Sequence, residues 1–194
     1  MIPTKYFLIF AGVNGAGKTT FYHAKTWLKA TYPTDMIRVN SDEILREFGG
    51  DHTSERDQLK AMKAAVRLIK DCFENGHSLN QETTLAGIKT LKDIKAARLS
   101  GYTIIMFYIG VANPEIAYNR IRRRADLGGH AVTYETLCRR FSASLRNLSV
   151  CISLCDEVYL VDNSDMFKTV RAYINGQKVF DSADENATWL PEDA

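Results

Sequence analysis

The chain has 194 residues, of which 45% are hydrophobic and 25% charged, and its formal net charge is +2. The composition is ordinary for a folded, water-soluble protein, and the length suits one core, so we expect a single domain over residues 1–194. A net charge this small gives no electrostatic reason to expect nucleic acid or a membrane surface as partner. No apolar run approaches a transmembrane length and no signal peptide is recognisable, which predicts a cytoplasmic location.

The four cysteines, Cys72, Cys138, Cys151 and Cys155, lack the Cys-x-x-Cys spacing of zinc and redox sites. We expect buried, reduced thiols here, in preference to a disulfide or a zinc site. The four histidines are also too scattered to suggest a metal site.

Strand-like and helix-like stretches alternate along the chain. Strands are predicted at Lys5–Ala11, Met36–Asn40, His77–Glu82, Thr103–Ile109 and Glu157–Val161. Helices are predicted at Lys18–Ala30, Glu55–Glu74, Ile88–Leu99, Pro114–Asp126 and Tyr134–Val150. This alternation is typical of crossover units, so we expect an α/β fold of three layers around a mostly parallel five-stranded sheet.

Two stretches carry finer signals. The helix predicted at Glu55–Glu74 has apolar residues at helical spacing, which predicts one buried face formed by Leu59, Met62, Ala65, Val66 and Ile69. Near the C-terminus, Asn175-Gly176 separates two strand-like runs, which predicts an antiparallel hairpin at the sheet edge.

Residues 12–19 read Gly-Val-Asn-Gly-Ala-Gly-Lys-Thr and match the phosphate-binding pattern G-x-x-x-x-G-K-[ST] without exception. The pattern lies between a predicted strand and a predicted helix, where the backbone N–H groups of such a loop surround a polyphosphate. The lysine of this pattern reaches the β- and γ-phosphates, and the following hydroxyl ligates Mg²⁺. We therefore predict a site for ATP or GTP with Mg²⁺, in which Lys18 is catalytic and Thr19 binds the metal. The nucleotide-binding residues are Gly12, Asn14, Gly15, Ala16, Gly17, Lys18, Thr19 and Thr20.

Asp42 lies just after the second predicted strand, on the edge of the sheet where ligands of open α/β folds bind. A carboxylate there could accept the proton of a substrate hydroxyl during phosphoryl transfer, which makes Asp42 a candidate catalytic and substrate-binding residue. The alternative is a purely structural role, with Ser41 or Asp42 as the N-cap of a short helix.

Glu82, Thr83 and Thr84 follow the third predicted strand at the same edge. Glu82 is predicted to hold Mg²⁺ through water or to contact substrate, and the two threonines add hydroxyls for substrate binding. The alternative is that all three are polar residues at an exposed strand end.

Arginines gather in the helix predicted at Pro114–Asp126, with Arg120 and Arg124 on one face. The planar guanidinium group binds phosphate oxygens in pairs, and Gly128-Gly129 could form a hinge. We therefore predict a lid around residues 113–150, in which Arg120 and Arg124 are catalytic. His130 and Arg140 are the predicted substrate contacts of this region. The alternative is that these charges lie on a solvated face.

Taken together, these segments resemble the zeta toxin family of small-molecule kinases, and its short single-domain bacterial members in particular. The resemblance runs over nearly the whole chain, through residues 12–20, 39–43, 81–85, 101–102, 120–130, 139–141, 144–148 and 159–164. It implies a P-loop kinase-like fold, ATP and Mg²⁺ on Lys18 and Thr19, Asp42 as general base, and Arg124 as a contact to the transferred phosphate.

In better-known members of that family, the substrate is UDP-N-acetylglucosamine, phosphorylated on the sugar 3′-hydroxyl, and an antitoxin protein covers the ATP site. Those members carry a substrate-binding glutamate on the helix before the third strand, where this chain has Ala64-Ala65-Val66-Arg67. A second lid arginine of the family is replaced near His130. The resemblance thus implies an ATP-dependent kinase, with a nucleotide sugar as one candidate acceptor and an antitoxin as a candidate partner.

Other functions fit parts of the same pattern. A nucleoside, nucleotide or antibiotic kinase would share the layout, and a P-loop ATPase could use the arginine run to follow a nucleic-acid backbone. The small net charge and the lack of a recognised DNA- or RNA-binding motif make nucleic acid the less favoured partner.

Overall fold

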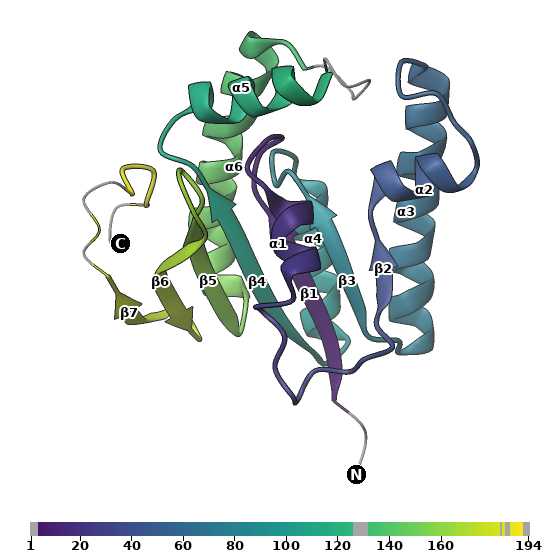
Figure 1. Ribbon diagram of the computed structural model, residues 1–194. Coiled ribbons are helices and arrows are strands. Elements are labelled where there is room, and N and C mark those ends of the chain that lie inside the picture. Colours follow the sequence, from purple (N-terminus) through teal and green to yellow (C-terminus); the bar gives the residue numbers. More distant parts are fainter. Residues whose placement is uncertain (1–3, 126–131, 183, 185–186, 192–194) are drawn as a thin grey trace.

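The computed structural model of the chain describes residues 4–125, 132–182, 184 and 187–191 (Figure 1). Its strands are β1 (Lys5–Ala11), β2 (Ile37–Val39), β3 (Leu79–Thr83), β4 (Tyr102–Gly110), β5 (Glu157–Asp162), β6 (Lys168–Ile174) and β7 (Gln177–Asp181). Its helices are α1 (Lys18–Ala24), α2 (Ser41–Glu47), α3 (Glu55–Asn75), α4 (Lys89–Leu99), α5 (Pro114–Ala125) and α6 (Tyr134–Leu154).

The strands form one sheet in the order β2-β3-β1-β4-β5-β6-β7. The pairs among the first five strands of this order are parallel, and β6 and β7 join antiparallel. The predicted parallel sheet and C-terminal hairpin are therefore confirmed. Strand β1 lies between β3 and β4, so the loop that follows it opens at the middle of the carboxyl edge of the parallel strands, where α/β proteins bind ligands.

Helices cover both faces of the sheet and give the predicted three layers (Figure 1). Successive side chains of a strand point to opposite faces, so Phe7 and Ile9 of β1 pack in a core with α3, α4 and α6. Leu8 and Phe10 face the other way, into a second core with Phe21 of α1 and with residues of α5. Because β1 is buried on both faces, the start of the phosphate-binding loop is anchored in the most enclosed part of the molecule.

Helix α1 ends at Ala24, six residues before the predicted end at Ala30. Lys25 adopts the left-handed conformation with φ 56°, and the chain then turns back so that the Trp27 indole donates a 2.8 Å hydrogen bond to the carbonyl of Tyr22. The Trp27 ring packs edge-on against Phe10 in the second core. This aromatic contact holds residues beyond Ala24 against the sheet in a non-helical path.

The predicted apolar face of α3 is buried only in part. Ile69 is 2% exposed, whereas Leu59 is 50%, Met62 58% and Val66 42% exposed. The C-terminal half of α3 packs on the sheet through Ile69 and Cys72, and its N-terminal half extends past the sheet edge beside α2 (Figure 1). The periodicity therefore identified the helix correctly and overestimated how much of its apolar face the sheet covers.

The cysteines behave largely as predicted. All four are free thiols, and Cys72, Cys151 and Cys155 are buried, while Cys138 on α6 is half-buried. Among the described residues, no helix is both long and apolar enough to cross a membrane.

Candidate active site

The phosphate-binding loop connects β1 to α1, and three of its glycines, Gly12, Gly15 and Gly17, have positive φ. At Gly12 the reason is steric as well as conformational: a Cβ atom there would lie 2.2 Å from the carbonyl oxygen of Ile109 on β4. The first position of the motif must be glycine for the loop to leave the sheet at this point.

Lys18, the first residue of α1, is only 8% exposed. Its Nζ donates a 3.1 Å hydrogen bond to the carbonyl of Val13 and lies 4.0 Å from Oε1 of Glu82. Burial lowers the pKa of the Lys18 ammonium group, and the negative charges of Glu82 and Asp42 oppose that shift. The ammonium group is therefore held at the loop by the carbonyl of Val13 and the carboxylate of Glu82, and the charge of Asp42 also acts on it.

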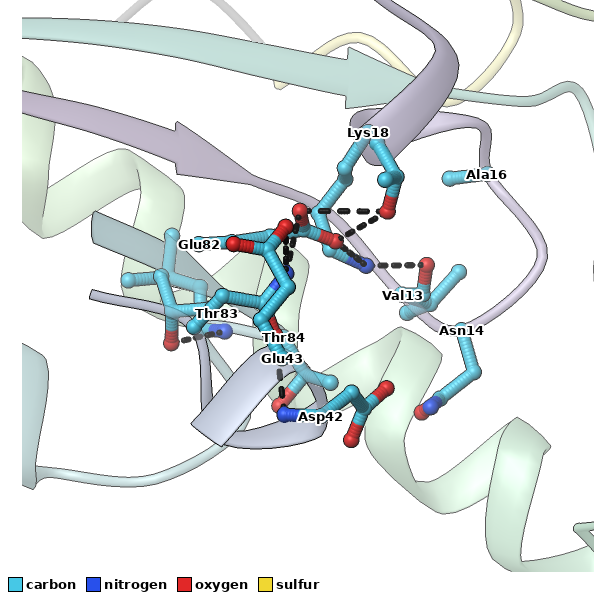
Figure 2. A network of polar contacts seen from close by, with 12 residues as sticks. Val13, Asn14, Ala16, Lys18, Asp42, Glu43, Glu82, Thr83 and Thr84 are labelled. Carbon is cyan, nitrogen blue, oxygen red and sulfur yellow. Dashed lines mark hydrogen bonds and ion pairs between the residues drawn. The ribbon is translucent and has the colours of Figure 1, made fainter. Parts of the chain in front are cut away.

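Glu82 at the end of β3 is the centre of a polar network (Figure 2). The hydroxyl of Thr19 donates to its two oxygens at 2.8 and 3.1 Å. On the other side, Glu82 Oε2 accepts hydrogen bonds from Arg38 at 2.7 Å and from Asn40 at 3.0 Å. These four contacts fix the carboxylate beside the phosphate-binding loop.

Arg38 holds this network together, although it was not among the predicted site residues. Its guanidinium group also pairs with Glu43 and donates to Asn80 at 3.2 Å, while it stacks on the ring of Tyr22 at 3.7 Å. The sequence contained a usable signal, because Arg38 of β2 and Asn40 just after it are two residues apart, as are Asn80 and Glu82 of β3. In a parallel pair with Arg38 opposite Asn80, all four side chains share one face.

Asp42 lies in α2, a helix that the sequence suggested only as an alternative. The residue that caps this helix is Asn40, which accepts the backbone N–H of Asp42 at 2.9 Å. The Asp42 carboxylate is not the cap, and within the described residues it has no hydrogen-bond partner. Its charge acts on Lys18, so the two side chains face a common space (Figure 2). The structural role and the candidate catalytic role therefore fall on neighbouring residues.

These residues line one cleft of about 710 Å³ that runs from the phosphate-binding loop between α3 and α4. Its polar lining contains predicted site residues from α1, α2, β3, α5 and α6 and from two loops: Asn14, Lys18, Asp42, Glu82, Thr83, Thr84, Arg124 and Arg140. Its apolar lining comes mainly from α3, where Met62 and Val66 form the exposed rim and Ala65 lies deeper. The cleft can hold a ligand much larger than a phosphate group.

The predicted arginines separate into two places. Arg124 lines the cleft, and Arg140 of α6 donates to Asn14 of the loop at 2.9 Å, beside Arg139. Arg120 instead donates to the carbonyl of Ser164, in the loop between β5 and β6, at 3.1 Å. The four-residue spacing of Arg120 and Arg124 predicts a shared helix face, but their side chains lie in different parts of the site. His130, Gly128 and Gly129 lie outside the described residues.

The oxygens of Thr19 and Glu82 make a donor set that suits Mg²⁺, a hard cation that prefers oxygen ligands. The described residues contain no group of three or more His, Cys, Asp or Glu side chains placed to hold a metal ion by themselves. A metal at Thr19 and Glu82 would need further ligands from phosphate and water, which is the usual situation of Mg²⁺ in nucleotide sites.

A family model described as Zeta toxin matches residues 3–185 of this chain. An uncharacterised protein of Haemophilus influenzae is 24% identical over 136 residues, which cover 69% of this chain and 91% of that protein. Among solved structures, AvrRxo1-ORF1:-ORF2 with ATP is similar at a TM-score of 0.70 and 16% identity, over 98% of this chain and 65% of that one. A structure from the PezAT chromosomal toxin–antitoxin system of Streptococcus pneumoniae is similar at a TM-score of 0.59 and 18% identity. The similarity covers 84% of this chain and 70% of that one.

Proposed function

Because this chain belongs to the zeta toxin family, we propose that it is an ATP-dependent kinase that transfers the γ-phosphoryl group to a hydroxyl of a small molecule. The observation that carries the proposal is the placement of Asp42. Its carboxylate is free of hydrogen bonds within the described residues, and it lines the same cleft as Lys18 of the phosphate-binding loop. A carboxylate with a structural role would accept backbone N–H groups at the start of its helix. Here the side chain of Asn40 caps the helix instead.

In the proposed reaction, Asp42 accepts the proton of the acceptor hydroxyl as its oxygen bonds to the γ-phosphorus. The bond between that phosphorus and the β–γ bridging oxygen breaks, and ADP leaves. Lys18 and the loop N–H groups stabilise the negative charge of the phosphates, and Arg124 stabilises the phosphoryl group as it is transferred. Thr19 and Glu82 would hold Mg²⁺, which would supply positive charge to offset that of the phosphates.

The base of the nucleotide is assigned to the end of the site near Arg120. The loop of Asp162, Asn163 and Ser164 touches the phosphate-binding loop, where Asn163 donates to the carbonyl of Ala16 at 2.7 Å. This contact supports a base-binding position continuous with the phosphates, for ATP or GTP. Arg139 and Arg140, on the other side, remain available for phosphate oxygens of the nucleotide or acceptor.

The family suggests a nucleotide sugar such as UDP-N-acetylglucosamine as acceptor, a role as a toxin, and an antitoxin partner. Two of the similar structures come from AvrRxo1-ORF1:-ORF2 and from a toxin–antitoxin system, which supports the partner proposal. The volume of the cleft supports an acceptor of that size. Ala65 lines the cleft on α3, in the stretch where the family's substrate glutamate is expected, so acceptor binding here rests on other residues.

The proposal is tested by incubating the protein with γ-labelled ATP, Mg²⁺ and a deproteinised metabolite extract, followed by separation and mass analysis of the labelled products. We expect label in one small molecule or a few, with a parallel GTP arm that gives the nucleotide preference. Label found only in inorganic phosphate would make the protein a P-loop ATPase. Label on added oligonucleotide ends, with a rate that falls steeply with salt, would identify a nucleic-acid enzyme.

A further inference from the structure

Residues 187–191, called here the C-terminal segment, dock on the carboxyl ends of β4 and β5, next to the assigned base-binding loop. Trp189 of this segment is 4% exposed and lies against the ring of Tyr108 at 5.5 Å between centroids. It also covers Gly110, where a Cβ atom would come within 2.3 Å of the indole. The absence of a side chain at Gly110 is therefore what admits the tryptophan.

The indole N–H of Trp189 donates a 2.7 Å hydrogen bond to Oδ1 of Asp162, the last residue of β5. The same carboxylate accepts both the hydroxyl and the backbone N–H of Ser164, each at 2.9 Å. The hydroxyl of Ser164 in turn accepts the backbone N–H of Ala112 at 2.8 Å. One carboxylate thus joins the C-terminal segment to the conformation of the loop.

The loop of Asp162, Asn163 and Ser164 also makes hydrogen bonds to residues at both ends of the proposed nucleotide site. Through Asn163 it holds the carbonyl of Ala16 in the phosphate-binding loop, and through the carbonyl of Ser164 it holds one guanidinium nitrogen of Arg120. The other terminal nitrogen of Arg120, Nη1, is buried and has no partner among the described residues. Leaving a buried donor without a partner costs free energy, so an acceptor brought there by a ligand would be favourable.

The segment has two further attachments to the rest of the fold. Thr188 donates to the carbonyl of Ala112 at 3.3 Å, and Arg171 of β6 donates to the carbonyl of Pro191 at 2.9 Å. These contacts, together with the buried indole, keep the segment in place at the edge of the sheet where nucleotide is expected.

We propose that Trp189 is a positioning residue for nucleotide binding: docking of the C-terminal segment fixes the Asp162–Ser164 loop and raises the affinity for ATP. The inference rests on the proposed function, since it concerns the same nucleotide site. Linkage requires the converse as well, so bound ATP strengthens docking of the segment by the same factor. Any event that displaces the segment would then lower ATP affinity without touching a phosphate contact.

The test measures ATP–Mg²⁺ affinity by calorimetry, with thermal unfolding, for the wild-type protein and Trp189→Phe. Phenylalanine keeps a ring over Gly110 and removes the donor to Asp162. We expect about tenfold weaker ATP binding, a size typical of coupling between sites. Once the protein is saturated with ATP, the turnover number should change little, because phosphoryl transfer uses other residues.

Trp27→Phe is the matched control, because Trp27 is also buried and its indole also donates one 2.8 Å hydrogen bond, to the carbonyl of Tyr22 away from this loop. We expect it to lower the unfolding temperature without changing ATP affinity. The chain contains two tryptophans, so Trp189 is the only one left in this variant. Acrylamide quenching of its fluorescence should decrease when ATP is added.

Equal ATP affinity in Trp189→Phe and the wild-type protein, together with a lower unfolding temperature, would make the segment purely structural and overturn the inference. If Trp189→Phe does not fold, Ser164→Ala tests the same connection and should also weaken ATP binding. A wild-type protein that binds neither ATP nor GTP would instead contradict the proposed function itself.

Discussion

Lys18 connects the phosphate-binding loop to the carboxylates across the cleft. Its Nζ is within reach of the Val13 carbonyl and of Glu82, so before a phosphate arrives its charge is already balanced within the protein. A bound triphosphate offers stronger acceptors, and the ammonium group then contributes to both nucleotide binding and the transition state.

Replacing Lys18 with alanine should therefore impair two steps. We expect weaker ATP binding and loss of most phosphoryl transfer, with the fold intact, because both ground state and transition state lose the same charge. Calorimetric ATP titration and label transfer measure the two quantities, and circular dichroism checks the fold. Transfer at the wild-type rate would show that the loop assignment is wrong.

Arg38 is the residue whose removal should damage the fold as well as the site. Its guanidinium group pairs with Glu43 and Glu82, and the side chain is only 16% exposed. Arg38→Ala leaves two largely buried carboxylates without their shared cation, which should cost about 3 kcal/mol in the free energy of unfolding. Urea denaturation measures this.

Arg98→Ala is the control for Arg38, since Arg98 donates to the carbonyl of Leu154 at an exposed position. It should change the free energy of unfolding by no more than about 0.5 kcal/mol. Similar small losses for both variants would show that the Arg38 network contributes little to stability.

Among the elements, α5 presents different arginines to different surroundings. Arg124 lines the cleft and its charge acts on Lys18, whereas Arg122 is exposed and is not part of the cleft lining. The helix therefore directs one cation toward Lys18 and the cleft.

Arg124→Lys should lower the turnover number more than ATP affinity, because lysine keeps the charge and loses the paired geometry of the guanidinium group. A catalytic arginine in related phosphoryl-transfer enzymes contributes roughly a thousandfold in rate, so even a partial role will be measurable. Arg122→Lys is the matched control and should leave both quantities unchanged. Equal and negligible effects at the two positions would remove α5 from the catalytic account.

At the level of elements, sequence and structure agree best where a segment is buried on both sides. The bounds of β1 agree with the prediction because five consecutive residues, 7–11, are buried in the two cores. The end of α1 was missed because its position depends on Trp27 packing against Phe10, a contact between segments that local periodicity does not encode.

The motifs of the candidate site can be predicted from the sequence, whereas the residues that hold the site residues in position are harder to predict. The P-loop pattern and the strand-end position of Asp42 are visible in the sequence. Arg38 would have been recognised only from the pairing of β2 with β3, and Trp189 only from the fold, since nothing local connects it to Asp162. Residues that position others are defined by tertiary contacts, whereas the phosphate-binding pattern is local.

For the molecule as a whole, three cysteines are sequestered by the packing of helices on the sheet. Burial raises the pKa of Cys151 to about 12 and that of Cys72 to about 11, and it raises the pKa of Cys155 as well. A raised pKa lowers the thiolate fraction at a given pH, and the thiolate is the reactive form.

Titration of the native protein with a thiol reagent at pH 8 should therefore modify one thiol rapidly, the half-buried Cys138, and all four in denaturant. Peptide mapping identifies the modified residue. Two or more fast-reacting thiols in the native protein would show that α3 and α6, which cover these cysteines, open more readily than their packing on the sheet indicates.

The most direct test of the account is the behaviour of Asp42→Asn, beside Asp71→Asn on the exposed surface of α3 as control. Asparagine keeps the shape of the side chain and removes its ability to accept the acceptor proton. Both variants should bind ATP with wild-type affinity, while label transfer from saturating ATP should fall by about a hundredfold or more in Asp42→Asn alone. Weaker ATP binding by Asp42→Asn with unchanged transfer at saturation would contradict the assignment of Asp42 as the base of a kinase.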